Sequence, residues 1–255
     1  MFPELFSIGP VTIHSYGLMV AVGVITAVWL ADARAMKTGV AEDGFMFMLG
    51  LFSLIGGFAG SKILFWLTIL PDVIANPSIM LDFANGFVVY GGLIGGILTA
   101  VVYCKIKKTD FFACFDVAAP VIALAQFFGR IGCFLAGCCY GQQTEGSFGV
   151  VFHDSLYAPV EVPLFPIQLV SAGLNLINFL FLSWLWQRKP KKGAVGAVYI
   201  ITYSVGRFVL EFFRGDLERG SVGTLSTSQF ISIFTVIIGV GMLIRLLYYK
   251  GEEKR

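Results

Sequence analysis

The sequence predicts an all-α polytopic membrane protein with about seven transmembrane helices, and three observations support this fold class. Of the 255 residues, 57% are hydrophobic and only 13% are charged, which is about half the charged fraction of an average soluble domain. Apolar runs long enough to cross about 30 Å of hydrocarbon as helix recur along the chain. Basic residues gather in alternate loops between these runs. We therefore expect residues 1–255 to form a single integral membrane domain.

Seven apolar runs are expected to form the transmembrane helices. They cover about 15–31, 45–70, 86–103, 111–128, 165–186, 194–214 and 227–248. The second run is long, so we expect it to tilt or to break near Gly56 and Gly57. Pro120 is expected to bend its helix, and Pro166 either bends its helix or opens it. Residues 1–14 hold no Lys or Arg, so the first run lacks the basic segment of a cleavable signal peptide.

The distribution of Lys and Arg predicts the orientation in the membrane. Thirteen of the 18 basic residues fall in the loops after the first, third and fifth runs and in the C-terminal tail. The N-terminus and the loop 71–85 hold none. Because basic loops stay in the cytoplasm, we expect an external N-terminus and a cytoplasmic C-terminus. The scattered basic residues and the net charge of +2 make nucleic acid an improbable partner.

Four other basic residues lie inside apolar runs or at their ends. They are Lys62, Arg130, Arg207 and Arg214. A cation buried in the bilayer costs at least about 2.5 kcal/mol, so each should face protein or a wet cavity. At 1.5 Å per residue, Lys62 and Arg207 should lie roughly 12 Å below the outer face. Arg130 and Arg214 should lie at that face.

Two interpretations of these cations are open. One takes them as helix-end side chains and a structural ion pair, with Glu211 pairing Arg207 across one helical turn. The other makes Arg130 and Arg214 an outward-facing anion site, because guanidinium groups present planar donor pairs suited to phosphate. Arg207, Glu211 and Arg214 are spaced to share one helical face. The nearest abundant phosphate is a lipid headgroup of the outer leaflet.

Glycine-rich segments are predicted at the same depth. Gly91 and Gly92 open the third helix, where close helix packing suffices to explain them. The segment 129–141 mixes Gly, Cys and Arg where the fourth helix should end. Non-helical backbone at that depth is tolerated only if it is buried in protein or lines a cavity.

The cysteines allow several interpretations. Cys133 could form a disulfide with Cys138 or Cys139, which are all on the predicted outer side. The sequence has no Cys-x-x-Cys pair, which disfavours thiol redox chemistry, and its two histidines, His14 and His153, are too far apart to suggest a metal site. Small apolar packing residues are the default interpretation.

Several segments together resemble the prolipoprotein diacylglyceryl transferase family nearly from end to end. They are Phe6-Ser-Ile-Gly-Pro10, His14-Ser-Tyr-Gly-Leu-Met19, Tyr90-Gly-Gly-Leu-Ile-Gly95, Gly129-Arg-Ile-Gly132, Pro166-Ile-Gln-Leu169 and Gly206-Arg-Phe-Val-Leu-Glu-Phe-Phe-Arg214. The resemblance implies a multi-pass enzyme of the bacterial inner membrane, with its active site near the outer leaflet. It implies transfer of a diacylglyceryl group from phosphatidylglycerol to the lipobox cysteine thiol of preprolipoproteins, with no cofactor and no metal.

The resemblance also implies roles for particular residues. Arg130 would grip the phospholipid headgroup, Arg214 would hold the leaving phosphate, and Tyr90 would act in catalysis. Further substrate contacts are implied for Tyr16, Gly91, Gly92, Cys133, Gly141, Gln168, Arg207 and Glu211.

The chain also departs from the family pattern. Tyr90 stands where the common bacterial form has His, which leaves the general base open, since the phenol pKa is near 10. Cys133 and Cys138 replace residues of an Asn-containing pattern, and Phe165, Val170 and Ser171 replace His, Tyr and Glu. Two alternatives to the transferase are a paralogue with a different lipid acceptor and an anion or lipid transporter. The absence of an internal repeat disfavours transport.

Overall fold

The structure is a computed structural model that describes residues 3–8, 11–82, 86–153, 155, 157–216 and 220–248. The tail residues 249–255, whose basic side chains enter the orientation argument, lie outside the described residues. The chain divides into two compact units. Unit 1 comprises Met1–Leu30 with Phe115–Arg255, and unit 2 comprises Ala31–Cys114.

The prediction of seven membrane-spanning helices is confirmed. Among the described residues, seven helices are long and apolar enough to cross a membrane. They are α1 (Ser15–Thr38), α2 (Phe45–Thr68), α4 (Val89–Ile106), α5 (Phe111–Ala136), α6 (Ile167–Gln187), α7 (Ala194–Glu211) and α8 (Thr227–Tyr248). Each predicted run overlaps one of these helices.

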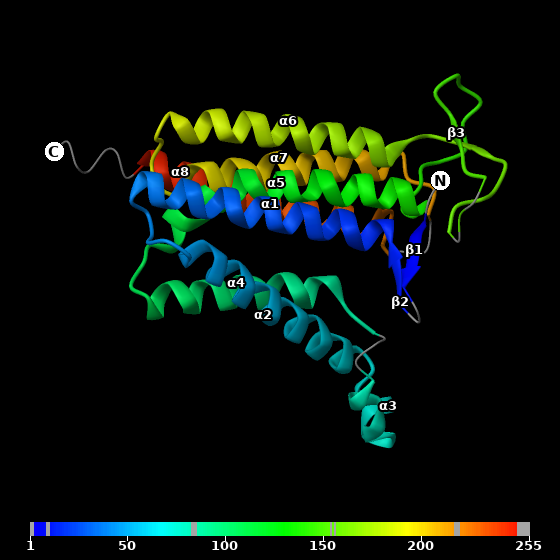
Figure 1. The fold of residues 1–255 in the computed structure, drawn as a ribbon, viewed down its shortest axis with the longest axis horizontal. Coiled ribbons are helices and arrows are strands. Elements are labelled where there is room, and N and C mark those ends of the chain that lie inside the picture. Colours follow the sequence, from blue (N-terminus) through cyan, green and yellow to red (C-terminus); the bar gives the residue numbers. More distant parts are fainter. Residues whose placement is uncertain are drawn as a thin grey trace. The chain divides into compact units, whose positions relative to one another are not determined.

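Unit 1 is built from the beginning of α1 and from α5 to α8 (Figure 1). Helix α7 packs against both α6 and α8. The Asp116 carboxylate accepts hydrogen bonds of 2.6 and 2.8 Å from the backbone N–H groups of Gly193 and Gly196. It thereby ties α5 to the N-terminus of α7, where a negative charge also complements the helix dipole. Gly23 of α1 lies against Phe128 of α5, because a Cβ added at Gly23 would be 2.9 Å from the Cβ of Phe128.

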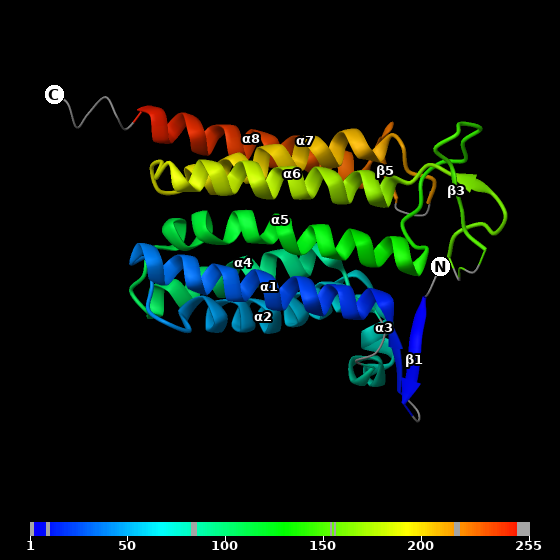
Figure 2. The same ribbon diagram turned by 45° about the horizontal axis from the view of Figure 1, so that its top comes forward.

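Short strand pairs and loops gather at one end of unit 1. Strands β1 (Glu4–Ile8) and β2 (Val11–His14) form an antiparallel pair that leads into α1. Two smaller antiparallel pairs follow α5 and α7: β3 (Val150–Val151) with β4 (Pro163–Leu164), and β5 (Ser221–Val222) with β6 (Leu225–Ser226). Figure 2 shows β1, β3 and β5 at the same end of the bundle. The sequence analysis did not predict these strands.

Unit 2 is held together by a close contact of α2 with α4. A Cβ added at Gly91 would lie 2.3 Å from the carbonyl oxygen of Gly60, and one at Gly95 would lie 2.3 Å from that of Gly56. The two helix backbones therefore touch, as expected for small residues at membrane helix contacts. A short helix α3 (Leu70–Ala75) and a 3-10 turn (Pro77–Leu81) follow α2.

Two local predictions are wrong, and one of two alternatives for helix α2 is excluded. Helix α2 does not break at Gly56 and Gly57, because these glycines let α4 approach instead; a tilt of this helix stays a prediction. Helix α5 continues to Ala136, so Arg130 is helical. Helix α7 ends at Glu211, so Arg214 lies beyond the helix and does not share its face.

Candidate lipid-headgroup site

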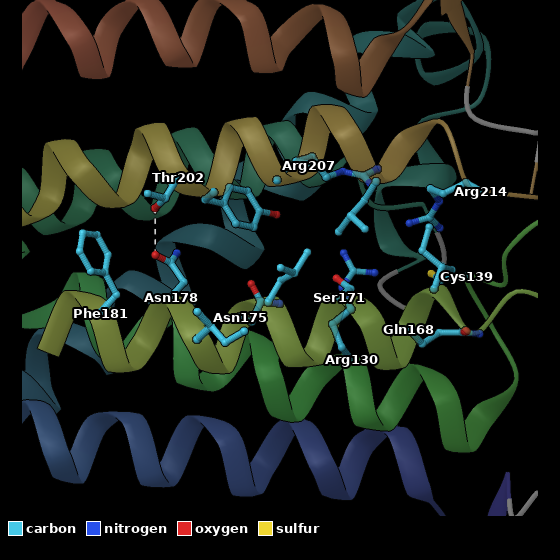
Figure 3. Close-up of a pocket in the computed structure, with 16 residues that line it drawn as sticks. Arg130, Cys139, Gln168, Ser171, Asn175, Asn178, Phe181, Thr202, Arg207 and Arg214 are labelled. Atoms are coloured by element: carbon cyan, nitrogen blue, oxygen red, sulfur yellow. Dashed lines mark hydrogen bonds between the residues drawn. The ribbon is translucent and has the colours of Figure 1, made fainter. Parts of the chain in front are cut away.

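A cavity of about 250 Å³ lies in unit 1. Its lining residues come from α5, α6 and α7 and from the segments that follow α5 and α7. Figure 3 shows Arg214, Cys139 and Gln168 toward one end, and Phe181, Asn178 and Thr202 toward the other. Gln168 and Phe181 are 13 residues apart on α6, which is roughly 20 Å along the helix. One end of the cavity is therefore cationic, and the rest of its lining is uncharged.

Two of the cavity arginines have acidic partners. Arg207 Nη2 lies 2.8 Å from Glu211 Oε2, and both side chains are largely buried. This confirms the predicted pair. The same guanidinium donates a 2.8 Å hydrogen bond to Ser228 Oγ. Arg214 donates from Nε and Nη2 to the two oxygens of Asp216, at 2.9 and 2.7 Å.

Arg130 differs from these two arginines. It projects from α5 into the same cavity (Figure 3). No carboxylate of the described residues forms an ion pair with it. Since Arg207 and Arg214 are each balanced by one acid, the described part of the cavity carries about one uncompensated positive charge. That charge matches one phosphodiester anion.

The segments after α5 and α7 hold one another at the cationic end. Gln142 N–H donates to Phe213 O at 3.0 Å, and Gly215 N–H donates to Tyr140 O at 3.1 Å. Gly141 pairs with Arg214 in a β-bridge. A Cβ at Gly141 would lie 2.3 Å from the carbonyl oxygen of Phe165, so only glycine fits there without a shift. Gly141 therefore positions the Arg214 backbone.

Helix α5 ends in a Schellman turn that brings three cysteines close together. Gly137 has φ +73°, its N–H donates to Phe134 O at 3.2 Å, and Cys138 N–H donates to Cys133 O at 3.1 Å. These are the two hydrogen bonds of that motif, and they fold Cys138 back over Cys133. Cys139 follows in the left-handed region, with φ 58°. All three thiols are free, and their Sγ atoms lie within 4.8 Å of one another.

The thiols at this end differ in their electrostatic surroundings. Hydrogen bonds with Cys133 and Cys138, followed by the neighbouring Arg214 guanidinium, hold the pKa of the Cys139 thiol below its ordinary value. Hydrogen bonds with the other two thiols raise the pKa of Cys138. Burial alone would lower the pKa of Arg214, but its hydrogen bonds to Asp216 and Cys139 outweigh burial and raise it.

Comparison with known proteins identifies the family. Residues 3–245 match the family model described as prolipoprotein diacylglyceryl transferase. The chain belongs to the prolipoprotein diacylglyceryl transferase family.

Named relatives agree with this assignment. A phosphatidylglycerol–prolipoprotein diacylglyceryl transferase of Clostridium tetani is 45% identical over 240 residues, which cover 94% of this chain and 96% of that protein. A protein of Clostridium perfringens named phosphatidylglycerol–prolipoprotein diacylglyceryl transferase 2 is 44% identical over 95% of this chain and 94% of its own length. A Staphylococcus haemolyticus relative is 31% identical, with 95% of this chain and 87% of that protein covered.

The remaining residues expected from the family pattern fall in different places. Tyr16 is about half exposed and packs near Gly132, where an added Cβ would be 3.3 Å from the tyrosine ring. It does not line the cavity described here. Tyr90, Gly91 and Gly92 begin α4 in unit 2, and the two glycines face α2. Their substrate contacts, like that of Cys133, stay predictions.

Among the residues expected from the family pattern, Gln168 presents a buried hydrogen-bond acceptor at the cavity. Its Nε2 donates to Cys138 O at 3.0 Å. Its Oε1 is buried and has no hydrogen-bond partner among the described residues, although the side chain lines the cavity. A ligand hydroxyl would satisfy this acceptor.

Sequence reasoning missed several cavity residues. The acid partner of the cavity residue Arg214 is Asp216, which lies beyond α7, where helical spacing predicts no contact. Polar side chains inside the fifth and sixth runs also line the cavity: Ser171, Asn175, Asn178 and Thr202. Polar residues are costly within an apolar span, so their presence was a usable signal.

Proposed function

We propose that this protein transfers a diacylglyceryl group from phosphatidylglycerol to the lipobox cysteine thiol of preprolipoproteins, the first step of bacterial lipoprotein maturation. Membership of the transferase family supports this activity and favours it over the transporter alternative. The observation that carries the proposal is the uncompensated guanidinium of Arg130 at the charged end of a cavity of headgroup size. Phosphatidylglycerol brings one negative phosphodiester charge to that end.

The polar headgroup and the acyl chains of the lipid match the two ends of the cavity in charge and polarity. Its phosphate accepts hydrogen bonds from Arg130 and from the Arg214 guanidinium that Asp216 orients. The headgroup glycerol donates a hydroxyl hydrogen bond to Gln168 Oε1, and this contact selects glycerol over headgroups that lack the hydroxyl. The acyl chains extend along α6 past Phe181.

The reaction is a displacement at carbon. The acceptor thiol loses its proton to solvent and, as the thiolate, attacks the glyceryl carbon that carries the phosphate; the C–S bond forms, and the C–O bond breaks. Both electrons of that bond leave on the phosphate oxygen, and glycerol phosphate departs. Charge builds up on the leaving phosphate, so donors fixed around it before the reaction stabilise the transition state most.

We also propose that the protein lies in the bacterial inner membrane, with this site near the outer leaflet. The C-terminal ends of α5 and α7, which carry the site, lead into the predicted external loops. Membrane-impermeant maleimide added to intact cells should label a Ser155→Cys variant and spare a Lys191→Cys variant. Labelling of the Lys191 position alone would reverse the orientation.

The central test measures release of labelled glycerol phosphate from headgroup-labelled phosphatidylglycerol in the presence of a lipobox peptide. Arg130→Ala should lower turnover by about 100-fold or more, as removal of a transition-state donor does. Arg130→Lys should remain impaired, because an ammonium keeps the charge but loses the paired donors. Arg188→Ala, at the other end of α6, is the matched control and should match the wild type. Full turnover in folded Arg130→Ala would exclude this site.

A further inference from the structure

A row of polar side chains lines the cavity within the apolar span of α6. Its members are Gln168, Ser171, Asn175 and Asn178. Residues at these intervals share one face of a helix. From Gln168 to Asn178 this polar stripe runs for roughly 15 Å along the axis. Buried polar groups are costly unless they are hydrogen-bonded, so the stripe requires partners that hydrocarbon cannot supply.

Asn175 is the member of the stripe that the chain leaves without a partner. Its side chain is only 8% exposed and lines the cavity. Its amide makes no hydrogen bond with any of the residues that the structure describes. Buried amides in folded proteins are almost always hydrogen-bonded, so an unpartnered one at a cavity indicates that a ligand completes it.

Asn178, about one turn further along α6, has half of its amide fixed. Thr202 Oγ1 of α7 donates a hydrogen bond of 2.9 Å to Asn178 Oδ1 (Figure 3). This bond uses the amide oxygen and orients the group, so its NH₂ is left to donate. The stripe therefore presents amide donors at two successive positions, roughly 4.5 Å apart along the helix.

The order of the polar groups along the cavity matches the order of groups in a diacyl phospholipid. Figure 3 shows the Arg130 side chain between Gln168 and Asn175. In phosphatidylglycerol, the phosphate lies between the headgroup hydroxyls and the two ester carbonyls. With the phosphate at Arg130 and a headgroup hydroxyl at Gln168, the ester carbonyls come next. They reach the amides of Asn175 and Asn178.

Apolar side chains border the cavity beside these amides. Leu174, Ile177 and Phe181 line it and are also exposed on the surface of α6. Helix α6 is long and apolar enough to cross a membrane, so such side chains face lipid hydrocarbon. Acyl chains that leave the esters can therefore pass from the cavity directly into the bilayer.

We propose that Asn175 and Asn178 form a subsite for the ester carbonyls of the diacylglyceryl group, and that this subsite selects ester-linked over ether-linked lipids. This inference rests on the proposed function. An ester carbonyl accepts a hydrogen bond from each amide, whereas an ether has no carbonyl and leaves the amides unpartnered. The esters stay on the glyceryl group throughout transfer, so these hydrogen bonds are the same in the ground state and the transition state. They therefore lower KM and leave kcat unchanged.

Steady-state kinetics with two phosphatidylglycerols of equal chain length, one diacyl and one dialkyl, test the subsite. The wild type should have a KM at least about tenfold lower for the diacyl lipid, which corresponds to one or two hydrogen bonds. Asn175→Leu, which keeps the size of the side chain, should raise the KM for the diacyl lipid about tenfold with kcat within about twofold. It should also bring the two lipids closer together. Leu180→Ala, on the exposed face of α6, is the matched control and should keep both wild-type KM values.

Two kinetic outcomes would overturn the subsite. Equal KM values of the wild type for the two lipids would show that the carbonyls are not recognised. If Asn175→Leu raised the KM for the lipobox peptide and not for the lipid, the carbonyl bound at Asn175 would belong to the acceptor.

Binding measurements without the acceptor peptide separate this proposal from the proposed function. In native mass spectrometry of the full-length protein in detergent, the diacyl lipid should bind about tenfold more tightly than the dialkyl lipid. Asn175→Leu should lose most of this preference. The same preference in a protein that transfers no lipid would uphold the subsite and refute the transferase. Transfer by a protein that binds both lipids equally would refute the subsite alone.

Discussion

Both units place a cation inside an apolar helix, but they treat its charge in opposite ways. In unit 2, Lys62 donates to the backbone carbonyl of Asp82 and lies 5.3 and 5.1 Å from the ring centroids of Phe65 and Phe87. In unit 1, Arg130 reaches into a cavity and no described carboxylate pairs with it. Of these two cations, we therefore take the one whose charge the protein leaves unbalanced as the mark of a site.

The glycines differ between the units in the same sense. In unit 2, Gly91 and Gly95 let two helix backbones touch. In unit 1, Gly137 and Gly141 allow sharp turns that place Cys138 and Arg214. Glycine-rich segments of similar composition thus serve packing in one unit and site construction in the other.

The largest expected effect concerns the buried ion pair of unit 1. Glu211→Ala should destabilise the protein by about 4 kcal/mol, because it leaves the Arg207 charge buried without its acid partner. Thermal unfolding in detergent measures the loss. The double variant Glu211→Ala/Arg207→Leu should recover most of it, since no charge then remains uncompensated. If Glu211→Ala unfolds at the same temperature as the wild type, the pair adds nothing to stability.

Next in size is the helix contact of unit 2. Gly91→Ala should cost about 2–3 kcal/mol, since its Cβ would stand 2.3 Å from the Gly60 carbonyl oxygen and the backbones must separate. Gly173→Ala in α6 is the matched control, because a Cβ there meets nothing within 4 Å. That variant should stay within about 1 kcal/mol of the wild type. Equal unfolding temperatures for the two variants would refute the close contact.

The sequence predicted the spans well and the site only in part. Membrane helices can be recognised in a sequence by the length and apolar composition of their segments, so all seven could be predicted. The end of α5 was misplaced because Gly129, Gly132 and Gly137 look alike in sequence, although only Gly137 has a positive φ. The sequence suggested that Cys133 could meet Cys138 or Cys139 in a disulfide, whereas the Schellman turn brings together three free thiols.

The pairing of Arg214 shows a second limit. Helical spacing correctly paired Glu211 with Arg207, because both lie on α7. Arg214 lies beyond the helix, and its partner Asp216 is only two residues away. Helical spacing therefore predicts contacts within a helix but gives no information on the segment that follows it.

A smaller effect is expected at Tyr90, which the family resemblance assigns to catalysis although it belongs to unit 2. Tyr90→Phe should lower transfer about tenfold with the fold intact, the equivalent of one lost hydrogen bond. Turnover and thermal unfolding of the same preparation separate the two effects. Normal turnover would show that the ring only packs and that the phenol has no part in the reaction.

The smallest effect is expected at Lys62, and this prediction tests the comparison between the two units most directly. Lys62→Met keeps an unbranched apolar side chain among the aromatic rings but leaves the Asp82 carbonyl without this donor. Loss of one such hydrogen bond should cost about 1 kcal/mol in unfolding free energy. Transfer per folded molecule should stay within about twofold of the wild type, because the charge of Lys62 is already satisfied within unit 2. Arg130→Met provides the matched loss of a cation in unit 1 and should nearly abolish transfer. If Lys62→Met remains folded yet loses transfer as Arg130→Met does, the two cations belong to one function and the distinction drawn between the units is wrong.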